Sequence, residues 1–201
     1  MKISYAILCK DEEQYLPKLL DTIIEYKSEE DEIVIVTDNP TEGVIKILND
    51  YSITHYDRPL NNDFGAQKNF LNSKCTGDYI FNIDADECPH ECLIGNLHEL
   101  LNQNDIDVYY VPRVNTVEGL TQEHIQKWGW RVNEQGWVNW PDPQMRIYKN
   151  KDNINWCNKV HEIIRGYDTF ARLPIQEEYS LLHHKDINRQ EKQNEHYSKI
   201  Q

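Results

Sequence analysis

The first half of the chain alternates short apolar runs with stretches whose apolar residues recur at helical spacing. Apolar runs that are rich in Ile, Val and aromatic residues and end in turn-forming residues are typical of buried strands. The predicted strands are residues 3–9, 32–37, 52–56 and 78–83. The predicted helices between them begin at Lys10, at residue 42 after the N-cap candidate Thr41, and at Phe64. This order predicts an α/β fold whose central sheet is mostly parallel and is flanked by helices.

The second half of the chain has a different character. A helix is predicted at 91–103 and a strand at 108–114, after which helical periodicity is weak. All five tryptophans lie in that later segment, interleaved with glycine and proline, which predicts a loop-rich or antiparallel extension of the same domain. A polar helix is predicted at 187–199. Because the chain carries no internal repeat and no Ser/Gly-rich linker, residues 1–201 are interpreted as one domain.

Charge and composition exclude several classes of protein. A formal net charge of -13, with scattered basic residues, argues against a nucleic-acid partner. No apolar run approaches the roughly 20 residues of a membrane helix, and the N-terminal apolar run is too short for a signal peptide, so we expect a cytoplasmic protein without a transmembrane segment. Five scattered cysteines do not form the paired framework of a secreted mini-protein, and we expect reduced thiols.

Polar side chains follow three of the predicted strands. Lys10 and Asp11 follow the first strand, Asp38 the second, and Asp84 and Asp86 the fourth. In open parallel sheets, ligands bind at the carboxyl ends of the strands. Two carboxylates flanking a small residue can converge on a hard divalent cation, which would bridge the phosphates of a nucleotide diphosphate. The alternative is an acidic turn that merely ends the strand.

Four sequence elements occur in order along the first half of the chain. They are Cys9–Glu13, Asp31–Glu42, Phe64–Asn69 and Ile83–Glu87. Together they resemble the inverting nucleotide-sugar glycosyltransferases of the Rossmann-like GT-A fold, especially the bacterial branch that builds lipopolysaccharide cores. The chain departs from that pattern in the second element, where the aspartate Asp38 comes one place late, and in the third, where Lys68 replaces an arginine.

This resemblance implies that residues 1–111 bind a nucleotide diphosphate sugar and that residues 112–201 bind the acceptor, which could be a glycan, a lipid-linked sugar or a protein. It implies Mn²⁺ or Mg²⁺ held by Asp84 and Asp86. His161, His183 or His184 could complete the metal shell or contact the phosphates, and among them we favour His183. The residues expected at the nucleotide sugar are Lys10, Asp11, Asp38, Gly65, Lys68, Asp84 and Arg146.

The resemblance continues in the second half, through Arg146-Ile147-Tyr148, Val160-His161-Glu162 and His183-His184. It implies that Glu162 is the general base, which takes the proton of the acceptor hydroxyl. Two alternatives stay open: Glu162 could be a surface carboxylate paired with Arg165, and Asp142 could be the base instead.

The tryptophans offer flat faces for an acceptor sugar. One or two of them are expected in the acceptor cleft, whereas packing in the core is the alternative for the others. The candidates are Trp128, Trp130, Trp137 and Trp140.

Two other function classes remain open from the sequence. A sugar nucleotidyltransferase would need a Gly-rich, basic N-terminal loop, but Lys10-Asp11-Glu12 is too acidic to cradle a triphosphate by itself. A non-catalytic carbohydrate-binding protein could keep a transferase-like fold, and the tryptophans are compatible with it. The intact acid pair Asp84 and Asp86 argues against that second alternative.

Overall fold

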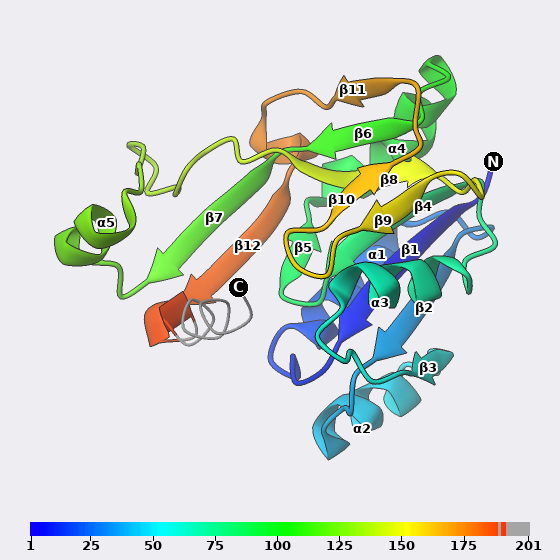
Figure 1. The fold of residues 1–201 in the computed structure, drawn as a ribbon, viewed down its shortest axis with the longest axis horizontal. Coiled ribbons are helices and arrows are strands. Elements are labelled where there is room, and N and C mark those ends of the chain that lie inside the picture. Colours follow the sequence, from blue (N-terminus) through cyan, green and yellow to red (C-terminus); the bar gives the residue numbers. More distant parts are fainter. Residues whose placement is uncertain (189, 192–201) are drawn as a thin grey trace.

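The computed structural model describes residues 1–188, 190 and 191. A seven-stranded central sheet has the order β11-β6-β8-β4-β1-β2-β3 (Figure 1). Only β8 runs against its neighbours β4 and β6, so the sheet is mostly parallel, as predicted. The strands are β1 (Ile3–Cys9), β2 (Glu32–Thr37), β3 (His55–Asp57), β4 (Tyr79–Asp84), β6 (Val108–Val111), β8 (Gln144–Lys149) and β11 (Phe170–Arg172).

Both faces of the central sheet are covered. Side chains of β1 such as Ile3 and Tyr5 pack with α1 (Leu16–Tyr26), α2 (Glu42–Asp50) and α4 (Glu91–Gln103) in one apolar core. On the opposite face, Ala6 packs in a second core with α3 and a two-stranded hairpin, and α3 lies in front of the sheet in Figure 1. Those elements are α3 (Phe64–Asn72), β9 (Asn155–Cys157) and β10 (Ile163–Arg165).

A second sheet of three strands continues from the end of the central one. It consists of β5 (Glu87–Pro89), β12 (Leu181–Asp186) and β7 (Arg113–Glu118), in the order β5-β12-β7. Figure 1 shows β7 and β12 side by side, projecting away from the central sheet toward α5 (Gln122–Trp128). Only Ala85 and Asp86 separate β4 from β5, so the acid pair lies where the two sheets meet. A short 3₁₀ helix (Glu177–Tyr179) precedes β12.

The first helix begins later than the sequence predicts. Residues 10–15 form a loop, and α1 starts at Leu16 with Pro17 in its first turn, where a missing N–H costs nothing. The Glu12 carboxylate accepts from the backbone N–H groups of Lys10 and Asp11, at 2.7 and 3.2 Å, and this holds the loop in a non-helical form. The polar residues 10–13, which were predicted to open the helix, therefore lie outside it. The N-cap prediction for Thr41 is confirmed, because its hydroxyl accepts from the Val44 N–H.

Two further predictions of secondary structure were wrong. The strand predicted at 108–114 is interrupted at Pro112 and divides between the two sheets, because proline cannot donate to a strand ladder. The helix predicted at 91–103, by contrast, is confirmed as α4, which starts directly after its N-cap His90. The segment predicted to be poor in helix contains α5, which Thr121 and His124 stabilise as a capping box.

The third strand lies at His55–Asp57 instead of 52–56. Residues 189 and 192–199 of the helix predicted at the end of the chain lie outside the described residues. Within the part of the chain that the structure describes, no helix combines the length and the apolar composition that crossing a membrane requires.

Candidate active site

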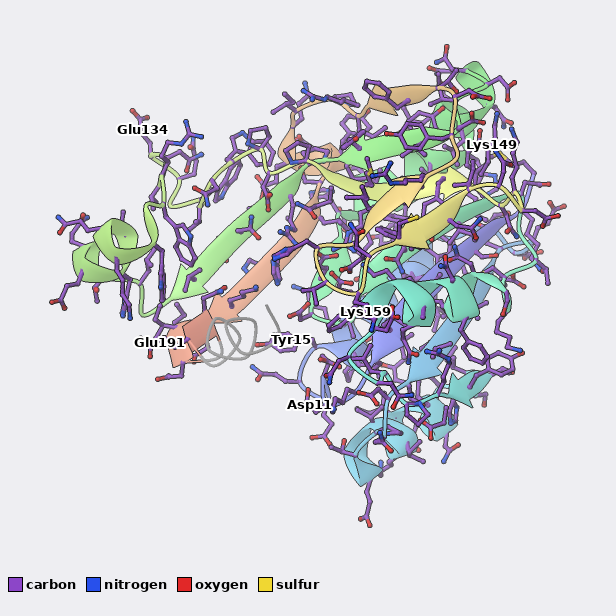
Figure 2. All side chains as sticks on the ribbon, in the orientation of Figure 1. Asp11, Tyr15, Glu134, Lys149, Lys159 and Glu191 are labelled. Carbon is purple, nitrogen blue, oxygen red and sulfur yellow. The ribbon has the colours of Figure 1, made fainter. Side chains whose placement is uncertain are left out.

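A cavity of about 1100 Å³ opens at the carboxyl ends of β1, β2 and β4. It is bounded as well by the start of α3, the segment before β10, and β12. The predicted site residues that line it are Lys10, Asp11, Asp38, Lys68, Asp84, Asp86, Glu162 and His183. Figure 2 shows Asp11 and Tyr15 on the loop after β1, near this end of the sheet. The topology therefore brings together residues that are up to 173 positions apart, as Lys10 and His183 show.

One wall of the cavity carries a fixed carboxylate, Asp38. The Lys10 ammonium lies 3.0 Å from its Oδ2, and the Leu60 N–H donates to its Oδ1 at 3.0 Å. Burial alone would raise the pKa of Asp38, but the Leu60 N–H and the Lys10 charge lower it below the ordinary value. Asp38 is therefore a charged acceptor at neutral pH and can bind ligand N–H or hydroxyl groups.

Asp84 ends β4 beside a buried arginine. Arg146 on the neighbouring strand β8 is 4% exposed and donates to both Asp84 and Glu87, the latter at 2.7 Å. Burial would raise the pKa of Asp84, but the Arg146 charge, with a smaller contribution from Lys68, holds it well below its ordinary range. The Asp84 carboxylate is thus ionised, with 38% of its side-chain surface still exposed.

Asp86 faces a histidine whose outer nitrogen is unsatisfied. His183 is 3% exposed, and its Nε2 lies 3.5 Å from Asp86 Oδ2, without a hydrogen-bond partner in the described residues. Burial would raise the pKa of Asp86, but its contact with His183 lowers it. A carboxylate and an unpartnered imidazole nitrogen at a cavity wall are ligands that divalent metal ions use.

The protein alone does not complete a metal site. Among the described residues, no three His, Cys, Asp or Glu side chains come together as a ligand set. Asp86 and His183 fit one side of a coordination shell, and Asp84 lies next to them with its carboxylate bound by Arg146. The remaining ligands would have to come from a bound phosphate or from water, as is common for Mg²⁺.

Behind the acid pair lies a buried chain of charges. Glu87, with a fully buried side chain, accepts through Oε1 from Arg146 and from Arg113, the latter at 2.8 Å. Arg113 also donates to Asp142 Oδ2 through Nε at 2.9 Å and Nη2 at 2.7 Å. Burial would raise the pKa of Asp142, but Arg113 and the Asn115 amide lower it. Asp142 therefore belongs to this buried chain of charges, and it is not among the described residues that line the cavity.

Glu162 and Lys68 form an ion pair inside the cavity. Their Oε1 and Nζ atoms are 2.6 Å apart, and their side chains are 17% and 6% exposed. The same ammonium lies 4.3 Å from the centre of the buried Trp156 ring. Glu162 pairs with Lys68 rather than with Arg165, which makes the interpretation of Glu162 as a surface carboxylate wrong.

Several predicted residues lie outside the cavity wall. Arg146 is not among the described residues that line the cavity, and it donates to Asp84, Glu87 and Asn82. Gly65 lies at the start of α3, where a Cβ would stand 2.4 Å from the Asn158 carbonyl oxygen. Only glycine allows this close approach, so Gly65 brings α3 against the segment that carries Glu162.

The four candidate tryptophans lie on the projecting arm between β7 and β8. All are half-buried, and they pack in two pairs with ring centres 4.7 and 4.8 Å apart. Figure 2 shows Glu134 at the tip of a loop of the same arm. The described residues that line the cavity include none of Trp128, Trp130, Trp137 and Trp140.

Sequence reasoning missed two central residues, Glu87 and Arg113. Glu87 belongs to the Ile83–Glu87 element, so its position was a usable signal. Arg113 had none, because its contacts with Glu87 and Asp142 depend on pairing between distant strands. The same holds for Lys185 and Gln144, which also line the cavity.

Two relatives among curated proteins match part of the chain. The lipopolysaccharide core biosynthesis glycosyltransferase LpsC of Rhizobium meliloti (strain 1021) is 32% identical over 110 residues, which cover 52% of this chain and 39% of LpsC. The uncharacterized glycosyltransferase RT0209 of Rickettsia typhi (strain ATCC VR-144 / Wilmington) is 31% identical over 86 residues, 43% of this chain and 28% of that protein. The chain thus matches well under half of the length of these relatives.

Solved structures share the fold. The crystal structure of S. aureus TarS 1-349 superposes with a TM-score of 0.67 at 15% identity, covering 92% of this chain and 60% of that one. The structure of TarS 1-349 in complex with UDP-GlcNAc gives a TM-score of 0.66 at 16% identity, covering 92% and 59%. The predicted α/β fold class is confirmed. A sequence model described as Glycosyl transferase family 2 matches residues 4–179, most of the chain. The chain therefore belongs to glycosyl transferase family 2, the family to which its four ordered sequence elements point.

Proposed function

We propose that this chain is a metal-dependent, inverting glycosyltransferase that moves a sugar from a nucleotide diphosphate donor to a hydroxyl acceptor. One observation carries this proposal: Asp84, Asp86, His183 and Glu162 line one cavity at the carboxyl ends of the strands in a family 2 chain. TarS, which shares the fold, was crystallised with UDP-GlcNAc, so a nucleotide sugar is the first class of ligand to test.

The donor would lie against the strands of the first half of the chain. Asp38 can accept hydrogen bonds from the base or ribose, with Lys10 and Asp11 beside it at the cavity edge. Lys68 provides a positive charge close to the acid pair, where a diphosphate would need compensation. We infer that residues 1–111 supply most donor contacts, whereas Glu162 and His183 come from the second half.

Asp84, Asp86 and His183 would hold a divalent cation, with Mn²⁺ or Mg²⁺ as the candidates. Once bound, the cation would neutralise the charge that develops on the leaving diphosphate. The ionised state of both carboxylates and the unsatisfied His183 Nε2 support this assignment. The Arg146 guanidinium keeps Asp84 oriented at the end of β4.

Glu162 is the proposed general base. The acceptor hydroxyl oxygen attacks the anomeric carbon while the bond from that carbon to the phosphate oxygen breaks, and Glu162 takes the hydroxyl proton. Its carboxylate faces the cavity and already accepts from Lys68, so its position is defined before substrate binds. Asp142 is a poorer candidate, because Arg113, Asn115 and Gln144 occupy its oxygens.

The test is calorimetric titration of nucleotide diphosphates, with and without Mn²⁺, into the wild type, Asp86→Ala and the control Asp50→Ala. Asp50 is an exposed carboxylate on α2, paired with Lys46. We expect one nucleotide to bind in a Mn²⁺-dependent manner to the wild type and the control, and to lose that dependence in Asp86→Ala. Equal metal-dependent binding by all three proteins would refute the role of Asp86.

Hydrolysis or transfer of the matching nucleotide sugar tests turnover. Metal-dependent release of the nucleotide, lost in Glu162→Gln with donor binding retained, supports a transferase. Binding without turnover would favour the carbohydrate-binding alternative, and synthesis of the sugar nucleotide from a triphosphate would favour the nucleotidyltransferase. The acceptor is proposed to be a glycan, a lipid-linked sugar or a protein, reached from the cytoplasm. Trp128, Trp130, Trp137 and Trp140 are proposed to guide the acceptor from the arm beside the cavity.

A further inference from the structure

Lys68 and Glu162 form an ion pair between two segments that are far apart in the chain. Lys68 lies on α3, and Glu162 lies in the loop between β9 and β10. The Lys68 Nζ donates to Glu162 Oε1 at 2.6 Å, and only 6% of the Lys68 side chain is exposed. An ammonium with so little exposure needs a negative partner, because a desolvated charge without one is costly. Lys68 can therefore exchange one anion for another, but it cannot simply lose Glu162.

The Trp156 ring supports the same ammonium, since the Lys68 Nζ lies 4.3 Å from its centre. Trp156 is held on both sides. Its backbone N–H donates to Asn69 Oδ1 at 2.9 Å, its carbonyl accepts from Asn69 Nδ2 at 2.8 Å, and its Nε1 donates to the Tyr148 hydroxyl at 2.9 Å. A cation–π contact attracts a charge to the face of a ring without specifying a hydrogen-bond partner. The ammonium can therefore turn from one anion to another while it stays over this ring.

Two other cations of the cavity wall are less suited to such an exchange. The Lys10 side chain is 56% exposed, so water weakens its attraction for an anion. Arg113 lies 2.8 Å from Glu87, whose side chain has no exposed surface, and it cannot leave without burying an unpaired carboxylate. Lys68 differs from both, because it is itself buried while its partner Glu162 belongs to a loop and faces the cavity.

We propose that the donor diphosphate competes with Glu162 for Lys68, so that donor binding releases the Glu162 carboxylate for the acceptor hydroxyl. Before the donor binds, the ion pair occupies Glu162 Oε1 and compensates its charge. Once a phosphate oxygen accepts from the Lys68 ammonium, Glu162 needs another donor, and the acceptor hydroxyl that it deprotonates is that donor. The binding order that follows is donor first and acceptor second. The inference rests on the proposed function for the identity of donor and base, whereas competition for Lys68 can be measured without turnover.

The test is calorimetric titration of the full chain at one fixed Mg²⁺ concentration, with inorganic pyrophosphate as one probe and UDP, GDP, ADP and CDP as the other. The test variant is Glu162→Gln, which keeps the side-chain size but removes the competing charge. We expect it to bind diphosphate at least about 5-fold more tightly than the wild type, the lower end of usual coupling between two bound groups. Unchanged or weaker binding in Glu162→Gln would overturn the proposal.

The matched control is Asp186→Asn, which removes a negative charge from the wall of the same cavity. The Asp186 Oδ1 accepts from the Asn188 N–H at 2.8 Å, and an asparagine oxygen can keep this bond. We expect a smaller gain in affinity than in Glu162→Gln. An equal gain in the two variants would show that the loss of any negative charge has this effect, and it would overturn the competition for Lys68.

Lys68→Met and the double variant complete a cycle. Without the ammonium, Glu162→Gln should bring no gain in diphosphate affinity, and a gain of the same size with and without Lys68 would refute the proposal. Lys68→Met alone leaves Glu162 without its partner and could fail to fold, whereas the double variant removes both charges. The double variant should bind diphosphate more weakly than Glu162→Gln does, and equal binding would show that Lys68 does not contact the diphosphate.

The two kinds of probe separate a failure of this inference from a failure of the proposed function. Binding of a nucleoside diphosphate without a gain in Glu162→Gln would keep the donor site and overturn the competition. A gain for pyrophosphate, with no binding of any nucleoside diphosphate, would keep the competition and refute the nucleotide donor. Absence of binding for both kinds of probe in every variant would refute both.

Discussion

Replacing Arg146 with methionine should strongly destabilise the fold. Methionine preserves much of the apolar stem but leaves the Glu87 carboxylate, which has no exposed side-chain surface, without one of its two cations. Breaking a buried ion pair by removing one partner costs about 3–5 kcal/mol. Because Arg113 still donates to Glu87 at 2.8 Å, we expect the lower end, about 3 kcal/mol. That is a large fraction of the roughly 5–15 kcal/mol by which proteins are usually stable.

Urea denaturation followed by circular dichroism measures this effect. With a slope of about 2 kcal/mol/M, a loss of about 3 kcal/mol lowers the midpoint by about 1.5 M. Arg165→Met, at an exposed arginine of β10, is the matched control and should change stability by less than about 0.5 kcal/mol. A loss below about 1 kcal/mol in Arg146→Met would show that the buried charge chain behind the acid pair does not stabilise the fold as argued.

Two further predictions concern acid stability and close packing. Burial would raise the pKa of Glu32, but hydrogen bonds from Lys2 and other nearby groups lower this pKa to about 2. The Glu32 carboxylate therefore stabilises the fold above its unfolded-state pKa of about 4.3, and this stabilisation is lost as pH falls toward 2. Glu32→Gln should therefore be about 1–2 kcal/mol less stable than wild type at pH 7, after allowance for partial exposure, and this difference should shrink progressively as the pH of the denaturation experiment is lowered from about 4 toward 2. A difference that is constant with pH would contradict this. Gly65→Ala should cost about 1–3 kcal/mol in urea denaturation, because its Cβ would stand 2.4 Å from the Asn158 carbonyl oxygen. Its control Gly95→Ala, in the interior of α4 with no atom within 4 Å of the new Cβ, should instead stabilise by about 0.5–1 kcal/mol, and similar effects at both glycines would rule out the packing argument.

The sequence alone determined the order of elements in the first half and the edge of the sheet where the site lies. The spacing of apolar residues along the chain predicts β1, β2, β4 and the helices between them, because buried strands and amphipathic helices differ in that spacing. The rule that ligands bind at the carboxyl ends of parallel strands then selects Asp38, Asp84 and Asp86, and all three line the cavity. Local pattern was sufficient there, because each of these residues lies at the end of a strand or within two residues of it.

Only the tertiary structure decided the contacts of the second half. The break at Pro112, the pairing of β12 with β7 and the close approach at Gly65 join segments that are far apart in the chain. Pairing partners and register are not encoded in the period of a single short strand, since a strand presents the same alternation to any neighbour. That packing also decides the partners of Glu162 and Asp142. It thereby places Glu162 in the cavity wall and Asp142 outside it. Side-chain roles that depend on distant neighbours become visible only once the chain has brought those neighbours together.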